Sequence, residues 1–152
     1  MEKKYFEDYT VGEQRVTPAR TLTEADIVNF AGLTGDWHPL HTDREYAAKT
    51  EFGERIAHGM LTLSVGTALL YRLGTYVSLP KSFIAFYGMD RVRFITPCRI
   101  GDTIHCVWKV VDLIAKDDKR GILVAENRIV NQKQEDAVVF ISRALVGRKP
   151  DA

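Results

Sequence analysis

The pattern of hydrophobic and polar positions changes character about half-way along the chain. In the first half, Ile27 and Phe30 are spaced as on one face of a helix. Thr23 precedes them and Asp26 follows it three residues later, which is the arrangement of a capping box at a helix start. Residues 60–76 are almost all apolar or small, which is typical of a helix buried on most sides.

The second half of the chain consists of runs that are rich in β-branched and aromatic residues. Two short runs come first, at residues 83–87 and 92–95. Three longer runs follow at residues 103–115, 121–131 and 137–146, joined by polar turns. One buried helix followed by a long antiparallel meander indicates an α+β fold, and we expect a curved sheet wrapped around that helix.

Loops separate the elements expected in the first half. Residues 35–43 read GDWHPLHTD, and Pro39 predicts that no helix runs through them, because proline lacks an amide donor and clashes with the preceding turn. Asp43 is a suitable cap for a short helix at residues 44–49. Nearer the N-terminus, residues 15–22 are expected to form an edge strand, because they contain a proline.

Length, composition and charge exclude several classes of protein. The chain has 152 residues, of which 45% are hydrophobic and 27% charged, so we expect a single folded domain over residues 1–152. The net charge of +1 argues against nucleic-acid binding as its main role. No apolar run is long enough for a membrane helix and the first residues lack a signal-peptide core, so a cytoplasmic location is expected. Cys98 and Cys106 suit a reducing compartment, and we expect both to be packing residues.

The residues that could carry chemistry are concentrated in and after one loop. His38, His41 and His58 are three of the four histidines in the chain. Asp36 and His41 could hold one water molecule and move a proton on and off it, because a carboxylate and an imidazole titrate below and near neutrality. Gly59 precedes the apolar helix, where the first amides lack internal partners and could polarise a carbonyl that approaches closely. An acid–base pair beside such amides is what the addition of water next to a thioester carbonyl requires.

Other interpretations of the same residues remain open at this point. His38 and His41 have a spacing that zinc sites use, and Asp36 or Asp43 would have to supply a further ligand. No cysteine lies nearby, so we expect no metal site. His58 is interpreted as a structural residue that braces the start of the helix.

Several segments of the chain match the motifs of one enzyme family. Residues 30–43 read FAGLTGDWHPLHTD and residues 52–62 read FGERIAHGMLT. Residues 94–97 and 101–103 match the strand and the turn that follow. Together these segments resemble the MaoC-like dehydratases, the (R)-specific enoyl-CoA hydratase family, over roughly residues 5–147.

The resemblance implies a fold, a reaction and a set of site residues. The implied fold is the hot-dog fold, α+β, with an antiparallel sheet around one long central helix, usually as a homodimer or a multiple of dimers. The implied reaction is reversible hydration of a trans-2-enoyl-CoA to an (R)-3-hydroxyacyl-CoA, with no cofactor beyond the coenzyme A of the substrate. Asp36 and His41 match the catalytic pair, and Gly59 matches the glycine whose amide faces the thioester carbonyl.

One position departs from the family pattern. The family usually has asparagine where this chain has His38, and an extra imidazole beside the site predicts a substrate-binding role. One alternative function is therefore a hydro-lyase acting on a branched or dicarboxylic acyl-CoA of the mesaconyl, itaconyl or methylmalyl type. A second alternative, from another class, is a hot-dog acyl-CoA thioesterase or acyl-binding protein.

Overall fold

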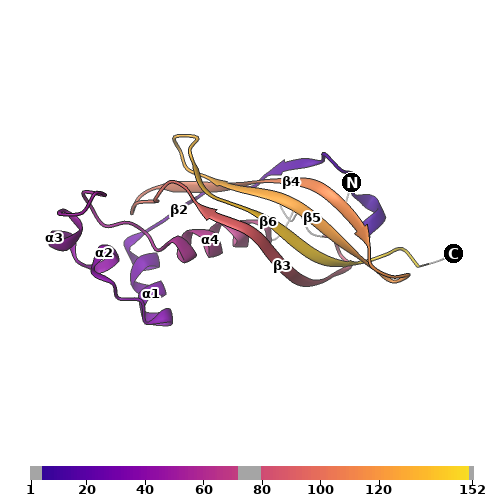
Figure 1. Cartoon of the computed structure of the whole chain (residues 1–152), viewed down its shortest axis with the longest axis horizontal. Helices are drawn as coiled ribbons and strands as arrows, with labels where there is room; N and C mark the ends of the chain where they lie inside the picture. Colours follow the sequence, from indigo (N-terminus) through magenta and orange to yellow (C-terminus); the bar gives the residue numbers. More distant parts are fainter. Residues whose placement is uncertain (1–4, 72–79, 151–152) are drawn as a thin grey trace.

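The fold is described from a computed structural model, which covers residues 5–71 and 80–150. Within these residues, six strands form one antiparallel sheet and the helices lie to one side of it or beyond its end (Figure 1). The elements in chain order are η1 (Phe6–Asp8), β1 (Gln14–Val16), β2 (Arg20–Thr21), α1 (Glu24–Thr34), α2 (Pro39–Thr42), α3 (Arg44–Ala47), α4 (Gly59–Ala68), η2 (Leu69–Tyr71), β3 (Phe83–Phe94), β4 (Thr103–Ala115), β5 (Arg120–Val130) and β6 (Asp136–Gly147).

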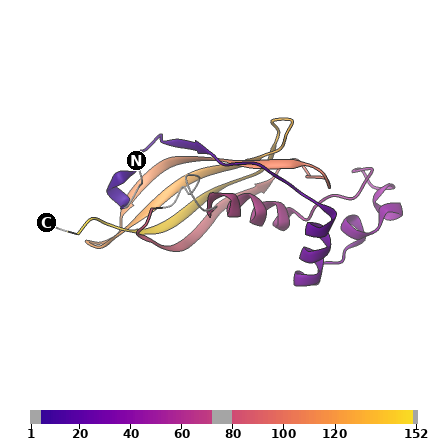
Figure 2. The same ribbon diagram turned by 180° about the vertical axis from the view of Figure 1, so that it is seen from behind.

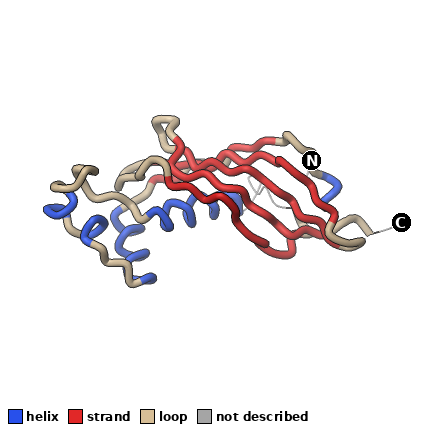
Figure 3. The backbone as a smooth tube through the Cα atoms, viewed as in Figure 1, coloured by secondary structure: helices blue, strands red, loops and turns tan. Residues whose placement is uncertain are grey.

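The sheet has the strand order β1-β4-β5-β6-β3, with the short β2 paired to β4. β4, β5 and β6 form the meander that the sequence predicts, and β3 pairs with β6 at one edge. Figure 3 shows these strands as one curved layer with α4 along it. The predicted α+β architecture, a curved antiparallel sheet around a central helix, is confirmed.

The hydrophobic core lies between the sheet and α4, which runs along one face of the sheet (Figure 2). Burial alternates along β4, as expected for a strand with one covered face. The largest fully buried side chains are Phe140, Leu22, Ile27, Ile104, Leu123, Ile129, Val110, Val138, Val146, Asn127 and Cys106. α4 is not covered all round, because Met60, Ser64 and Ala68 form an exposed row one turn apart on it.

Two sequence-based predictions about the first half of the chain were wrong in detail. Pro39 does not exclude a helix but begins one, since it occupies the first position of α2, where its missing amide has no partner to lose. The strand expected over residues 15–22 is divided into β1 and β2, because the proline at position 18 interrupts the pairing with β4.

The later elements agree more closely with the pattern. β4 has the predicted bounds, and the two short runs expected before it join into the single strand β3, which contains register shifts where it pairs with β6. The predicted central helix corresponds to α4 and η2 as far as Tyr71, and its remaining residues, 72–76, lie outside the described part of the chain. Among the described helices, none is long and apolar enough to cross a membrane.

Candidate active site

Asp36 is positioned by the end of α1. The helix begins with the predicted capping box, in which the Thr23 hydroxyl accepts from the Asp26 amide and the Asp26 carboxylate accepts from the Thr23 amide. It ends at Gly35, whose φ of +79° is the left-handed conformation that glycine adopts without a steric penalty. Asp36 follows directly, and its Oδ1 accepts a hydrogen bond from the His38 amide at 3.2 Å. The side chain is 48% exposed, so it faces solvent at the rim of the site.

His41 is held on the single turn of α2. Its Nδ1 lies 2.7 Å from the carbonyl oxygen of Ile56, which can only accept, so Nδ1 carries the proton. In the neutral ring the lone pair is therefore on Nε2. The pKa of His41 is lowered, and burial of the ring is the largest cause. The neutral form, which can accept a proton, therefore predominates at neutral pH.

The side chains of Asp36, His41 and His58 lie close together. Their ligand atoms, one nitrogen or carboxylate oxygen from each residue, all lie within 4.8 Å of one another. A water molecule that accepts or donates at ordinary hydrogen-bond lengths of about 2.8 Å can bridge two atoms at such a separation. The structure thus brings the predicted pair together, in a geometry that can hold one water.

Gly59 begins α4 beside this cluster. Among the described residues, no acceptor receives its amide, as expected at the first position of a helix. A Cβ atom at this position would lie 2.9 Å from Cδ1 of Phe94, so glycine allows the aromatic ring to pack directly against the start of the helix. The amide is available to a ligand that enters from the adjoining cavity.

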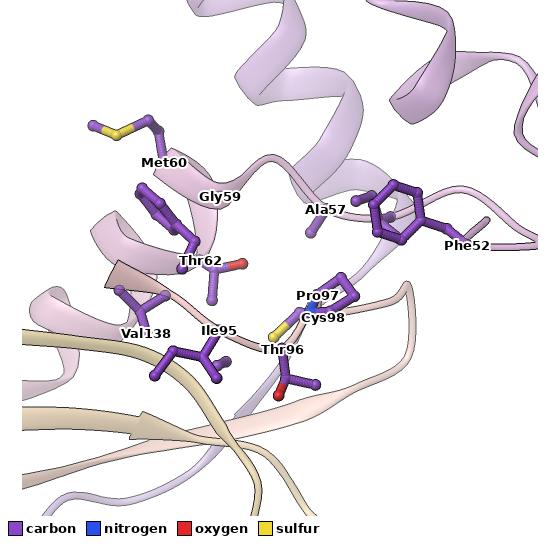
Figure 4. Close-up of a pocket in the computed structure, with 13 residues that line it drawn as sticks. Phe52, Ala57, Gly59, Met60, Thr62, Ile95, Thr96, Pro97, Cys98 and Val138 are labelled. Carbon is purple, nitrogen blue, oxygen red and sulfur yellow. The ribbon is translucent and has the colours of Figure 1, made fainter. Parts of the chain in front are cut away.

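A cavity of about 540 Å³ lies on this side of α4 (Figure 4). It is formed by residues of the loop before α4, the first turn of α4, the end of β3 with the segment that follows it, and the start of β6. All of them are apolar or uncharged: Phe52, Ile56, Ala57, Gly59, Met60, Thr62, Phe94, Ile95, Thr96, Pro97, Cys98, Ala137 and Val138. This volume is within the usual range for small-molecule sites, about 300–1,000 Å³. The cavity can accept an apolar group next to the Gly59 amide.

The cavity-lining residues Phe52, Thr62 and Phe94 were missed by the sequence-based reasoning. Phe52 and Phe94 come from segments more than forty positions apart, so only the folded chain shows that they share a cavity. The one available signal is that both lie inside segments that match the family motifs.

The His38 side chain makes its contacts within the loop and with α3, and not in the cavity. Its Nδ1 accepts a hydrogen bond from the Leu40 amide at 3.1 Å, which caps the start of α2, and its ring packs edge-on against Tyr46. It is absent from the residues that line the cavity, as are Asp36 and His41. The substrate-binding role expected for His38 stays a prediction, and no contact in the structure supports it.

His58 is buried at the residue that precedes Gly59. Its Nε2 lies 3.0 Å from the carbonyl oxygen of Asp36 and therefore carries a proton. Asp36, His41 and His58 are grouped closely enough to reach one metal ion. A metal bound through Nε2 of His58 would require that proton to move and the hydrogen bond to the Asp36 carbonyl to break.

The two cysteines are buried and free, as predicted. Burial raises the pKa of the Cys98 thiol to about 11 and that of the Cys106 thiol to about 12. Both groups are therefore protonated near neutral pH, and neither is a ready nucleophile, although Cys98 lines the cavity.

Comparison with known proteins places this site in a family. The family model described as a MaoC like domain matches residues 7–134. The chain belongs to this MaoC-like family. The residues around Asp36, His41 and Gly59 all lie inside the matched region.

Two curated MaoC-like relatives show the extent of the similarity. The chain is 47% identical over 103 residues to protein MaoC of Klebsiella aerogenes, which covers 68% of this chain and 29% of that protein. It is 41% identical over 110 residues to an (R)-specific enoyl-CoA hydratase of Rhodospirillum rubrum, covering 72% of each. The chain therefore spans less than a third of the Klebsiella protein.

Solved structures show that the fold is shared along the chain. An Archaeoglobus protein described as a monoamine oxidase regulatory protein is 38% identical, with a TM-score of 0.90 over 99% of this chain and 98% of that one. A MaoC-like dehydratase from Rhodospirillum rubrum is 28% identical, with a TM-score of 0.84 over 97% and 99%. A double hot-dog protein from Mycobacterium tuberculosis is 20% identical, with a TM-score of 0.80 over 99% of this chain and 46% of that one. The hot-dog fold predicted for this chain is confirmed.

Proposed function

We propose that the protein is a hydro-lyase that reversibly adds water to a trans-2-enoyl-CoA to give an (R)-3-hydroxyacyl-CoA. The observation that carries the proposal is the meeting of Asp36 and His41 within the reach of one water molecule, next to the N-terminus of α4. The names of relatives in the MaoC-like family, among them an (R)-specific enoyl-CoA hydratase, support the same reaction.

The proposed reaction uses the pair as follows. Asp36 and Nε2 of His41 hold the water, and the imidazole accepts its proton as the oxygen forms a bond to the β-carbon. The electrons of the carbon–carbon double bond move toward the thioester, and the Gly59 amide donates to the enolate-like oxygen. The pair then returns one proton to the α-carbon, so that one water has been added. The reverse sequence eliminates water.

The cavity favours an uncharged acyl chain. Among the described residues, no lysine, arginine or histidine lines it, and a carboxylate placed there would lose its hydration without a compensating charge. The alternative of a dicarboxylic acyl-CoA therefore gains no support from the cavity. We expect turnover of crotonyl-CoA to exceed that of mesaconyl-CoA when the two are compared at equal concentration.

The test is the hydration of crotonyl-CoA, followed by the loss of its conjugated absorbance. Asp36→Asn and His41→Ala should each lower kcat by about 10²–10⁴-fold, the contribution typical of a general acid or base. Asp43→Asn is the matched control, because Asp43 is a loop carboxylate that caps α3 and asparagine caps equally well.

Full activity in either Asp36→Asn or His41→Ala would contradict the proposed catalytic role of this pair. Release of free thiol from the substrate, detected with a thiol reagent, would instead support the thioesterase alternative, because hydration leaves the thioester intact.

We further propose that the working unit is a homodimer. Within the described part of the chain, β3 is an edge strand of 12 residues that pairs with β6 on one side only. It carries exposed Ile84 and Phe86, and α4 has an exposed row that begins at Met60. A long apolar edge strand is a template for pairing with another chain, and a second copy of this chain would cover both features.

A further inference from the structure

His58 is a buried histidine that the proposed reaction does not use. It is 2% exposed and is the N-cap residue of α4, but its side chain makes no capping hydrogen bond. Burying an imidazole costs free energy unless its nitrogens are satisfied, and within the described residues only Nε2 has a hydrogen-bond partner while Nδ1 has none. The Nε2 hydrogen bond and the ring contacts therefore have to explain its position.

The first contact ties the Asp36 loop to the start of α4. Nε2 of His58 donates to the backbone carbonyl of Asp36 at 3.0 Å, across 22 positions of the sequence. Because His58 immediately precedes Gly59, this hydrogen bond sets the position of the Asp36 loop relative to the first amides of the helix. It connects the two halves of the proposed active site through one ring.

The second contact is a stack on His41. The rings of His58 and His41 have centroids 3.9 Å apart and an interplanar angle of 29°, and Phe30 packs on His58 with centroids 5.0 Å apart. One face of the His41 ring is therefore covered by His58, which excludes water from it. Burial of the ring, to which His58 contributes one face, is the main cause of the lowered pKa of His41. The hydrogen bond to Ile56 and the Asp36 carboxylate act in the opposite direction, and the electrostatic effects of His58 and His38 act in the same one.

We propose that His58 is a positioning residue, which fixes Asp36 through its Nε2 hydrogen bond and orients and desolvates His41 through the ring stack. The catalytic consequence rests on the proposed function, whereas the structural coupling between His58 and His41 does not.

Two variants separate the two contacts. His58→Gln keeps an amide donor near the place of Nε2 and loses the ring, while His58→Phe keeps the ring and loses the donor. His105→Gln is the matched control, because His105 lies on β4 and takes part in neither contact.

The readouts are an NMR titration of the His41 ring and the pH profile of kcat/KM for crotonyl-CoA. In His58→Gln the pKa of His41 should rise toward the ordinary histidine value, because water reaches the uncovered ring. The midpoint of the acid limb of the kcat/KM profile should shift to higher pH by the same amount. In His58→Phe the His41 titration should stay low, while kcat falls by about 10–100-fold, since small displacements of catalytic groups cost this much.

An unchanged His41 titration in His58→Gln would overturn the proposal, and it does so whether or not the chain hydrates crotonyl-CoA. Losses in kcat that only follow the folded fraction measured by circular dichroism would also overturn it. Where His58→Phe does not fold, the titration of His58→Gln decides alone. A wild-type chain without hydratase activity, but with the expected shift in His58→Gln, would overturn the proposed function and leave the coupling intact.

Discussion

At the scale of single residues, the hydrogen bond of His41 to a backbone carbonyl decides which nitrogen can do chemistry. Nδ1 of His41 donates to the Ile56 carbonyl, so the lone pair of the neutral ring is on Nε2. Burial lowers the pKa of the ring, while the hydrogen bond to Ile56 acts in the opposite direction. The hydrogen bond thus sets the tautomer and burial sets the protonation state, and both suit a general base near neutral pH.

The first prediction concerns the pH dependence of activity. Because the neutral ring of His41 is the proposed base, kcat/KM should fall as the pH drops through the pKa of His41. The midpoint of this acid limb should lie below the ordinary histidine value of about 6.5. Rate measurements on crotonyl-CoA between pH 5 and pH 8 check this, and a midpoint above the ordinary value would contradict it.

The same lowered pKa links His41 to stability. Between the folded and unfolded pKa values, the unfolded chain binds a proton on His41 that the folded chain does not bind. The contribution of His41 to the free energy of unfolding therefore decreases as the pH falls below the unfolded value.

A second prediction at this scale concerns His38, whose observed role is to cap α2. His38→Asn should retain the cap, since asparagine is among the best capping residues, and should change kcat/KM for crotonyl-CoA by less than about 3-fold. His38→Ala should lose about 1 kcal/mol of stability, measured by denaturant unfolding. A large change in substrate preference in His38→Asn would instead support the substrate-binding role expected from the sequence.

At the scale of the elements, the close packing of α4 on the sheet depends on a glycine. A Cβ atom at Gly66 would lie 2.5 Å from Cγ1 of Ile129 on β5, in the middle of the core. Gly66→Ala should therefore destabilise the fold by about 1–3 kcal/mol, although alanine is the better helix former. Ile129→Val in the same chain should restore part of this loss, because it removes the terminal methyl group from the contact.

Gly32 provides the control for this measurement. It lies within α1, and a Cβ atom there would meet only Trp37 at 4.0 Å. Gly32→Ala should leave the free energy of unfolding unchanged or raise it by up to about 1 kcal/mol. Denaturant unfolding of both variants checks the pair, and equal effects would contradict the packing argument.

The elements differ in how far the sequence predicts them, and the reason is physical. β4 was predicted with its observed bounds, because a long run of β-branched and aromatic residues between polar turns allows few other structures. α2 was missed, because one turn of helix depends on a proline at its first position and a histidine cap rather than on periodicity.

The residues of the candidate site likewise divide into those that the sequence predicts and those that only the folded chain reveals. Asp36, His41 and Gly59 could be selected because they lie in motifs that read along the chain. The contacts of His58 could not, since its hydrogen bond spans 22 positions and its stack on His41 depends on how the loop folds back.

At the scale of the whole molecule, the open edge at β3 is the feature to test. Phe86→Lys places a charge on this edge and should shift the proposed dimer to monomer in light scattering coupled to size exclusion. Val16→Lys is the matched control, because Val16 is similarly exposed on β1, the short edge on the other side of the sheet. Dissociation by Val16→Lys alone, or a wild-type chain that is monomeric at all concentrations, would contradict the proposed interface.

The two buried cysteines have a consequence for how the protein withstands oxidation. Only a thiolate reacts readily with peroxides or disulfides, and both thiols are protonated near neutral pH and shielded from solvent. Oxidative damage at Cys106, which lies in the core, is therefore limited by the rate at which the chain opens, and not by the amount of oxidant. Cys98 lines the cavity, so its resistance depends on the thiol staying protonated.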